Sequence, residues 1–78
     1  MKYKVVQCGW DPVTQGTEIQ ESILCSCLDE AQVCACMLTP LTLKQVQAEC
    51  ESNIIPIYKD ELNRYKYIID QNTTIFEV

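Results

Sequence analysis

The chain of 78 residues is predicted to form one α+β domain over residues 1–78, in which a small antiparallel sheet has its helices packed on one face. Strand-like alternation of apolar and polar residues occurs near both ends, and apolar residues recur at helical spacing in between. The resulting order of elements is β-β-α-α-β-β-β. The composition is typical of a folded domain, since 47% of the residues are hydrophobic and 22% are charged.

The first two strands are expected to pair as a hairpin. Residues 3–8 are rich in strand-forming side chains, and residues 9–16 contain Asp-Pro and two glycines, which favour a turn. Residues 17–24 alternate with the period of a strand. One face of this second strand would carry Ile19, Glu21 and Ile23.

A first helix is predicted from a cap motif followed by an apolar stripe. Ser26 and Asp29 fit the Ser-x-x-Asp pattern, in which the serine hydroxyl accepts a hydrogen bond from the backbone N–H of the third helical residue. Apolar residues then recur at helical spacing: Leu28, Ala31, Cys34, Ala35 and Leu38. This stripe is expected to face the sheet.

A second helix is expected after Pro40, which ends the first one. Proline suits the first position of a helix, so Pro40 offers one way to begin it. Thr42 with Gln45 offers another, as a pair of capping residues. An apolar set follows at helical spacing: Leu43, Val46 and Cys50. The helix is expected to end near residues 51–53.

The last third of the chain is predicted to return to strands. Residues 54–58 are apolar but contain Pro56, so they form an edge strand or are broken by a bend. Residues 65–69 alternate as a strand does, although a helix over residues 60–69 is an alternative, because apolar residues there also have helical spacing. Residues 74–78 form the final strand.

Six cysteines occur in the chain: Cys8, Cys25, Cys27, Cys34, Cys36 and Cys50. No signal peptide is apparent, so we expect a cytoplasmic protein with reduced thiols rather than a disulfide framework. Cys25, Cys27, Cys34 and Cys36 form two C-x-C pairs, whereas structural zinc sites usually use C-x2–4-C. Cys34 and Cys36 would be about 200° apart on the helix, which makes Cys36 the more exposed. No cofactor is therefore predicted, and a zinc-stabilised adaptor built on these cysteines is kept as an alternative.

The charge distribution is the feature that bears most on function. Residues 5–43 contain no Lys, Arg or His, but they contain acidic residues: Asp11, Glu18, Glu21, Asp29 and Glu30. An acidic surface of this kind favours a protein partner with a basic surface. Trp10, expected in the turn, is the best single contact candidate, because tryptophan is enriched at interface hot spots. Alternatively, its indole folds back over the end of the sheet. These six residues are the predicted partner-binding set.

Other function classes fit the residues less well. Residues 58–67 interleave aromatic and basic side chains, but a sheet with tyrosines inside and lysines outside explains them, and the net charge of -5 opposes direct binding of nucleic acid. The chain has no histidine to activate a cysteine and no marked pair of carboxylates, so an enzyme is not expected. No window approaches the about 20 apolar residues that span a membrane.

In its general form the chain resembles small phage-encoded inhibitors of bacterial defence, the anti-CRISPR proteins. The resemblance lies in the acidic run without cations and in the order strand, strand, helix over residues 2–8, 16–24 and 26–38. It implies a non-catalytic inhibitor, acting in the host cytosol, that blocks a basic, nucleic-acid-binding surface of a defence protein. A self-assembling structural protein is the other alternative, since residues 74–78 carry few charges and could pair edge to edge into a homodimer.

Overall fold

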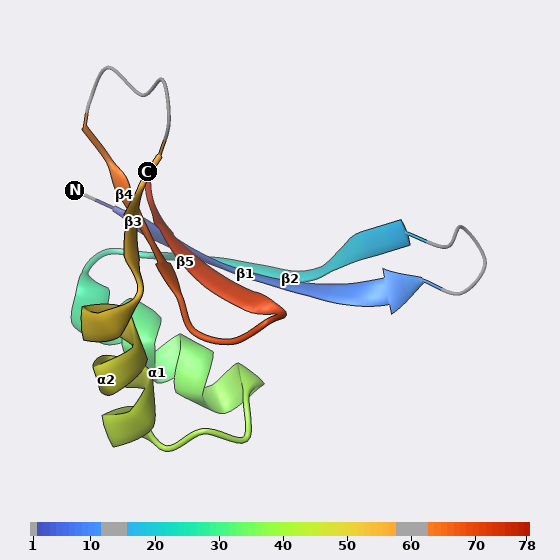
Figure 1. Ribbon diagram of the computed structural model, residues 1–78, viewed down its shortest axis with the longest axis horizontal. Coiled ribbons are helices and arrows are strands. Elements are labelled where there is room, and N and C mark those ends of the chain that lie inside the picture. Colours follow the sequence, from blue (N-terminus) through green and yellow to red (C-terminus); the bar gives the residue numbers. More distant parts are fainter. Residues whose placement is uncertain (1, 12–15, 58–62) are drawn as a thin grey trace.

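The computed structural model describes residues 2–11, 16–57 and 63–78, and within them it has one antiparallel sheet with two helices on one face (Figure 1). The elements in chain order are β1 (Tyr3–Asp11), β2 (Gly16–Cys25), α1 (Leu28–Leu38), α2 (Leu43–Ser52), β3 (Ile54–Pro56), β4 (Tyr65–Ile68) and β5 (Thr73–Glu77). This order and the antiparallel pairing confirm the predicted α+β fold class. No helix among the described residues is long and apolar enough to cross a membrane.

The strands lie in the order β2-β1-β5-β4-β3, so the last strand of the chain occupies the centre of the sheet. In β5, Ile75 has Val5 of β1 on one side and Tyr67 of β4 on the other. The expectation that residues 74–78 present a free edge is therefore wrong, because both sides of β5 already have a pairing strand. Among the described residues, the edges left for a second copy to pair with are those of β2, of β3 and of the part of β1 beyond Cys8.

The strands after the helices agree with the pattern of the sequence. Pro56 lies in β3 at the edge of the sheet, where its missing N–H interrupts no ladder between two neighbours. β4 is hydrogen-bonded to β3 and to β5, so the helical alternative for residues 60–69 is wrong where the structure describes it. Residues 60–62 lie outside the described part.

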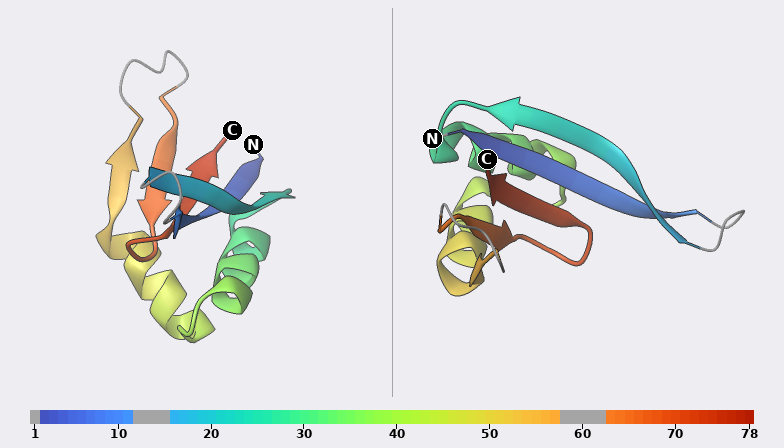
Figure 2. Two further views of the ribbon diagram at one scale, coloured as in Figure 1. Left: turned by 90° about the vertical axis from the view of Figure 1, so that its right-hand side faces the viewer. Right: turned by 90° about the horizontal axis from the view of Figure 1, so that it is seen from above.

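The core lies between the helices and the one face of the sheet that they cover, as the left view of Figure 2 shows. Val5 and Ile75 from the two central strands are 0% exposed, as are Ala31 and Ala35 of α1. The small side chains of these alanines let the helix lie close to the sheet. The buried apolar residues are Val5, Cys25, Ala31, Ala35, Val46, Cys50, Tyr67, Ile69 and Ile75. The opposite face of the sheet has neither of the described helices over it.

The two helices begin in different ways. α2 has the predicted capping box, in which Thr42 Oγ1 accepts the Gln45 N–H at 3.2 Å and Gln45 Oε1 accepts the Thr42 N–H at 2.8 Å. α1 has Cys27 as its N-cap, without a side-chain cap, so the predicted cap by Ser26 is wrong. The Ser26 hydroxyl instead donates to the Glu30 carboxylate at 2.7 Å, because an ionised acceptor makes the stronger hydrogen bond.

The hairpin of β1 and β2 is longer than the sequence indicates. Trp10 lies in β1 opposite Thr17, not in the turn, and Asp11 is paired with Gly16. β5 pairs with β1 only as far as Gln7. Beyond this residue the hairpin continues away from the rest of the sheet (Figure 1). We call this part, residues 8–11 with residues 16–21, the hairpin arm.

A β-bulge stands at the base of the hairpin arm. Gln7 is opposite Glu21 and Cys8 is opposite Ile19, so Gln20 has no partner. The side chain of Gln20 lies against Gly9, where a Cβ atom would meet it. Because the extra residue resets the alternation, Ile19 and Glu21 point to opposite faces, and the prediction that they share one is wrong.

Candidate functional site

The hairpin arm carries the first group of predicted binding residues. Glu18 and Glu21 are exposed, and Ile19 between them is 64% exposed. Trp10 and Asp11 belong to the arm through their backbone pairing, but their side chains lie outside what the structure describes. Beyond Cys8, each strand of the arm has only the other as a pairing strand in the described part, so each keeps an outer edge of backbone donors and acceptors.

The second group lies at the start of α1. Asp29 and Glu30 are exposed there, and hydrogen bonds from the Ser26 hydroxyl and backbone N–H lower the pKa of the Glu30 carboxyl. Glu18 is near the beginning of β2 and Asp29 lies beyond its end at Cys25, and the strand from Glu18 to Cys25 alone is about 23 Å long. The structure therefore divides the predicted binding residues between the hairpin arm and the start of α1, which lie apart along β2 (Figure 1).

The cysteines of the two C-x-C pairs do not all converge. Cys25 is 2% exposed and its Sγ lies 3.6 Å from Sγ of Cys34, whereas Cys27 is exposed. Cys36 is half-buried, as Cys34 is, and its thiol donates to the Leu41 carbonyl at 3.3 Å. Burial, with the hydrogen bond to Cys34, raises the pKa of Cys25 to about 11. In the described ranges, no group of three or more potential metal ligands comes together.

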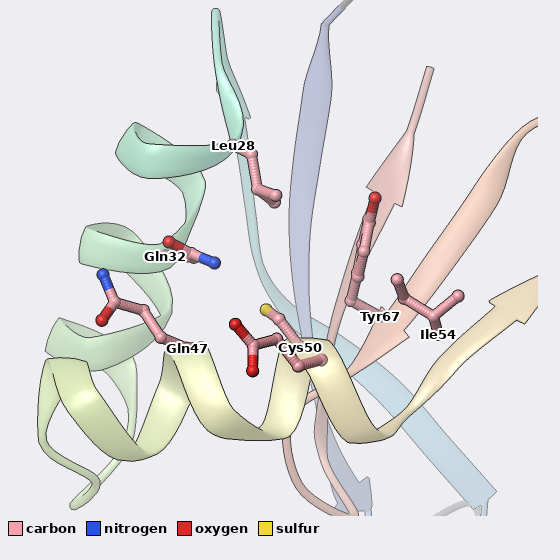
Figure 3. A pocket seen from close by; sticks show the side chains of 7 residues that line it. Leu28, Gln32, Gln47, Cys50, Ile54 and Tyr67 are labelled. Carbon is pink, nitrogen blue, oxygen red and sulfur yellow. The ribbon is translucent and has the colours of Figure 1, made fainter.

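A hollow of about 320 Å³ opens between the two helices and the β3–β4 edge of the sheet (Figure 3). Its lining comes from four elements: Leu28, Gln32, Gln47, Cys50, Glu51, Ile54 and Tyr67. Gln32, Cys50 and Tyr67 are buried at its base, whereas Ile54 at its rim is 49% exposed. The hollow thus combines an apolar rim with side-chain amides and a carboxylate.

The thiol of Cys50 and the phenol of Tyr67, both buried in this hollow, are in their neutral forms at physiological pH. Burial raises the pKa of the Cys50 thiol, although a hydrogen bond from Gln32 acts in the opposite direction. Burial, together with the nearby Glu77 carboxylate, raises the pKa of Tyr67 to about 12. A protonated thiol and a phenol can take part in hydrogen bonds with a group that enters the hollow.

Sequence reasoning missed this hollow. Leu28 and Gln32 are four residues apart in the sequence, as are Gln47 and Glu51, so the helical period places each pair on one face. The helical period predicts which residues of each helix share a face. It does not predict that the two faces lie opposite each other, because it does not depend on how α1 and α2 pack.

Comparison with known proteins adds no relative. No protein-family model matches the chain, and searches of curated proteins and of solved structures found no match.

Proposed function

We propose that the protein is a non-catalytic binding module that uses its hairpin arm to occupy a positively charged surface of a protein partner. The observation that supports this is the arm itself, a two-stranded extension beyond the body of the sheet with exposed carboxylates at Glu18 and Glu21. It lies inside the run of residues 5–43 that contains no Lys, Arg or His.

The arm has the chemistry that such a role needs. Carboxylates that project from the body attract a basic surface and speed encounter with it. Ile19 is exposed on the face of the arm opposite to Glu18 and Glu21, so it supplies an apolar contact where the partner encloses the arm, and the open strand edges offer backbone hydrogen bonds. A basic surface that binds nucleic acid would be covered by such an arm, which makes the protein an inhibitor in the manner of anti-CRISPR proteins.

Site-specific photo-crosslinking tests where the partner binds. We expect p-benzoylphenylalanine in place of Ile19 to crosslink one host protein in the cells that naturally express the chain. The matched control places the same group at Met37 of α1, which is 80% exposed but far along the chain from the arm. The purified partner should then lose binding to its nucleic acid when the protein is added, measured by gel shift. Equal crosslinking from both positions would contradict the proposal.

Charge reversal tests the electrostatic part of the proposal. The double variant Glu18→Lys/Glu21→Lys should bind the crosslinked partner about tenfold or more weakly at low salt, with an unchanged melting temperature. The control is Glu51→Lys, which reverses the charge of an exposed acid on α2, outside the hairpin arm. If the two sets of variants bind alike, the arm is not the recognition surface.

A further inference from the structure

The face of the sheet opposite the helices has a regular arrangement of side chains. In the register of the sheet, Phe76 of β5 lies between Lys4 of β1 and Lys66 of β4. Because side chains alternate along a strand, these three point away from the face that carries Val5 and Ile75. We call this surface the open face; its described strand positions are Lys4, Val6, Ser22, Leu24, Ile55, Lys66, Ile68, Thr74 and Phe76.

The open face differs in charge from the rest of the molecule. Its strand positions include two lysines and no carboxylate, although the chain as a whole has a net charge of -5. The exposed acids of the described residues lie on other surfaces: Glu18 and Glu21 on the hairpin arm, Asp29 and Glu30 on α1, and Glu51 on α2. The exposed acids therefore lie on other surfaces than Lys4 and Lys66.

The open face is also apolar and partly hollowed. Leu24 is 60% exposed, and Val6, Ile68 and Phe76 are half-buried although no described helix covers them. A shallow hollow of about 300 Å³ runs beside Phe76, lined by Lys4, Val6, Ile57, Arg64, Phe76, Glu77 and Val78. Across the strands, apolar and polar side chains alternate on this face, in the rows Leu24-Lys4-Phe76-Lys66-Ile55 and Ser22-Val6-Thr74-Ile68. A partner that covered it would meet apolar and positively charged groups side by side.

We propose that the open face binds an acidic amphipathic segment of another protein, with apolar side chains over Phe76 and carboxylates against Lys4 and Lys66. A sheet face is ordinarily buried by another layer of structure, and an amphipathic helix is the usual one. The segment must be acidic because its flanks would meet the two lysines. This proposal goes beyond the role of the hairpin arm and does not depend on it.

Two other occupants fit less well. A second copy of the chain packed through the same face would bring the lysines of both copies together, a like-charge arrangement that opposes symmetric pairing. Single-stranded nucleic acid prefers several aromatic platforms along a basic groove, whereas this face has one aromatic side chain, Phe76, among aliphatic ones at its described positions.

The test uses the ¹⁵N-labelled protein and three probes in NMR titrations: an amphipathic peptide of leucine and glutamate, the same peptide with lysine for glutamate, and oligothymidine. We expect the glutamate peptide alone to shift the amide signals of Lys4, Val6, Phe76 and Ile68. The double variant Lys4→Glu/Lys66→Glu should bind this peptide about tenfold more weakly at low salt. Lys44→Glu, an exposed lysine on α2, should leave the affinity unchanged.

The outcomes separate the alternatives. Shifts confined to the open face and lost in the double variant support the proposal, provided that circular dichroism shows an unchanged melting temperature. Absence of binding, equal binding of the lysine peptide, or preferential binding of oligothymidine each overturns it, the last in favour of nucleic acid. Because Glu18 and Glu21 are unchanged in these variants, failure here leaves the hairpin-arm proposal standing, and the reverse also holds.

Discussion

Adjacent residues on opposite faces of β5 should differ sharply in what they contribute to stability. Ile75 is 0% exposed and lies between Val5 and Tyr67, whereas Phe76 is half-buried on the open face. Truncation of a fully buried isoleucine to alanine costs about 2–5 kcal/mol, because transfer energy is lost and a cavity remains. For Phe76→Ala the lost side chain is partly in water already and leaves no enclosed cavity, so about 1–2 kcal/mol is expected.

The scale of total stability determines the assay. The free energy of unfolding of a domain of 78 residues is about 4–12 kcal/mol, so Ile75→Ala could remove most of this stability. Ile75→Val, expected to cost about 1 kcal/mol, keeps the comparison measurable and should lower the melting temperature by about 4–8 °C. Urea unfolding followed by far-UV circular dichroism gives the free energies. If Phe76→Ala costs more than Ile75→Ala, the assignment of the two faces is wrong, and with it the open face.

Three further predictions concern single elements. Thr42→Ala should cost about 1 kcal/mol in urea unfolding by removing the cap of α2, and an unchanged midpoint would show that the cap contributes nothing. The pKa of Tyr67 is raised to about 12 from 10.0 by burial first and Glu77 second, so the unfolded chain loses this proton before the folded one. Stability should therefore be intact below about pH 9 and fall as the pH rises from 10 to 12, less steeply in Tyr67→Phe; equal slopes would refute this. Iodoacetamide should modify the exposed Cys27 first and Cys25 and Cys50, which are 2% and 3% exposed, only on unfolding, as peptide mass spectrometry would show.

Local patterns in the sequence predicted the elements well where short-range physics decides them. The capping box of Thr42 and Gln45 uses groups three residues apart, so its geometry follows from the helix itself. Pro56 indicated an edge strand because its missing N–H is a local property. The cap at Ser26 failed because two local hydrogen bonds competed, and the carboxylate of Glu30 was the better acceptor.

The candidate surfaces were less predictable. The sequence identified the acidic residues but not their positions in space, since the length of β2 separates Glu18 from Asp29. The bulge at Gln20 could not be foreseen, since strand alternation contains no sign of one inserted residue until the partner strand is known. Lys4 and Lys66 are far apart in the sequence. They lie on one face, on either side of Phe76, because β5 pairs with both β1 and β4.

The sequence by itself determined the α+β class, the order of the elements, the cap of α2 and the acidic character of residues 5–43, since each depends on neighbouring residues or on composition. Tertiary structure alone decided that β5 lies between β1 and β4, which turned an expected free edge into the centre of the sheet. It also decided that Lys4 and Lys66 flank Phe76, and that both helices leave one face uncovered. Pairing between distant strands has no local signature, because it is set by which arrangement buries the most apolar surface while every central strand keeps two partners.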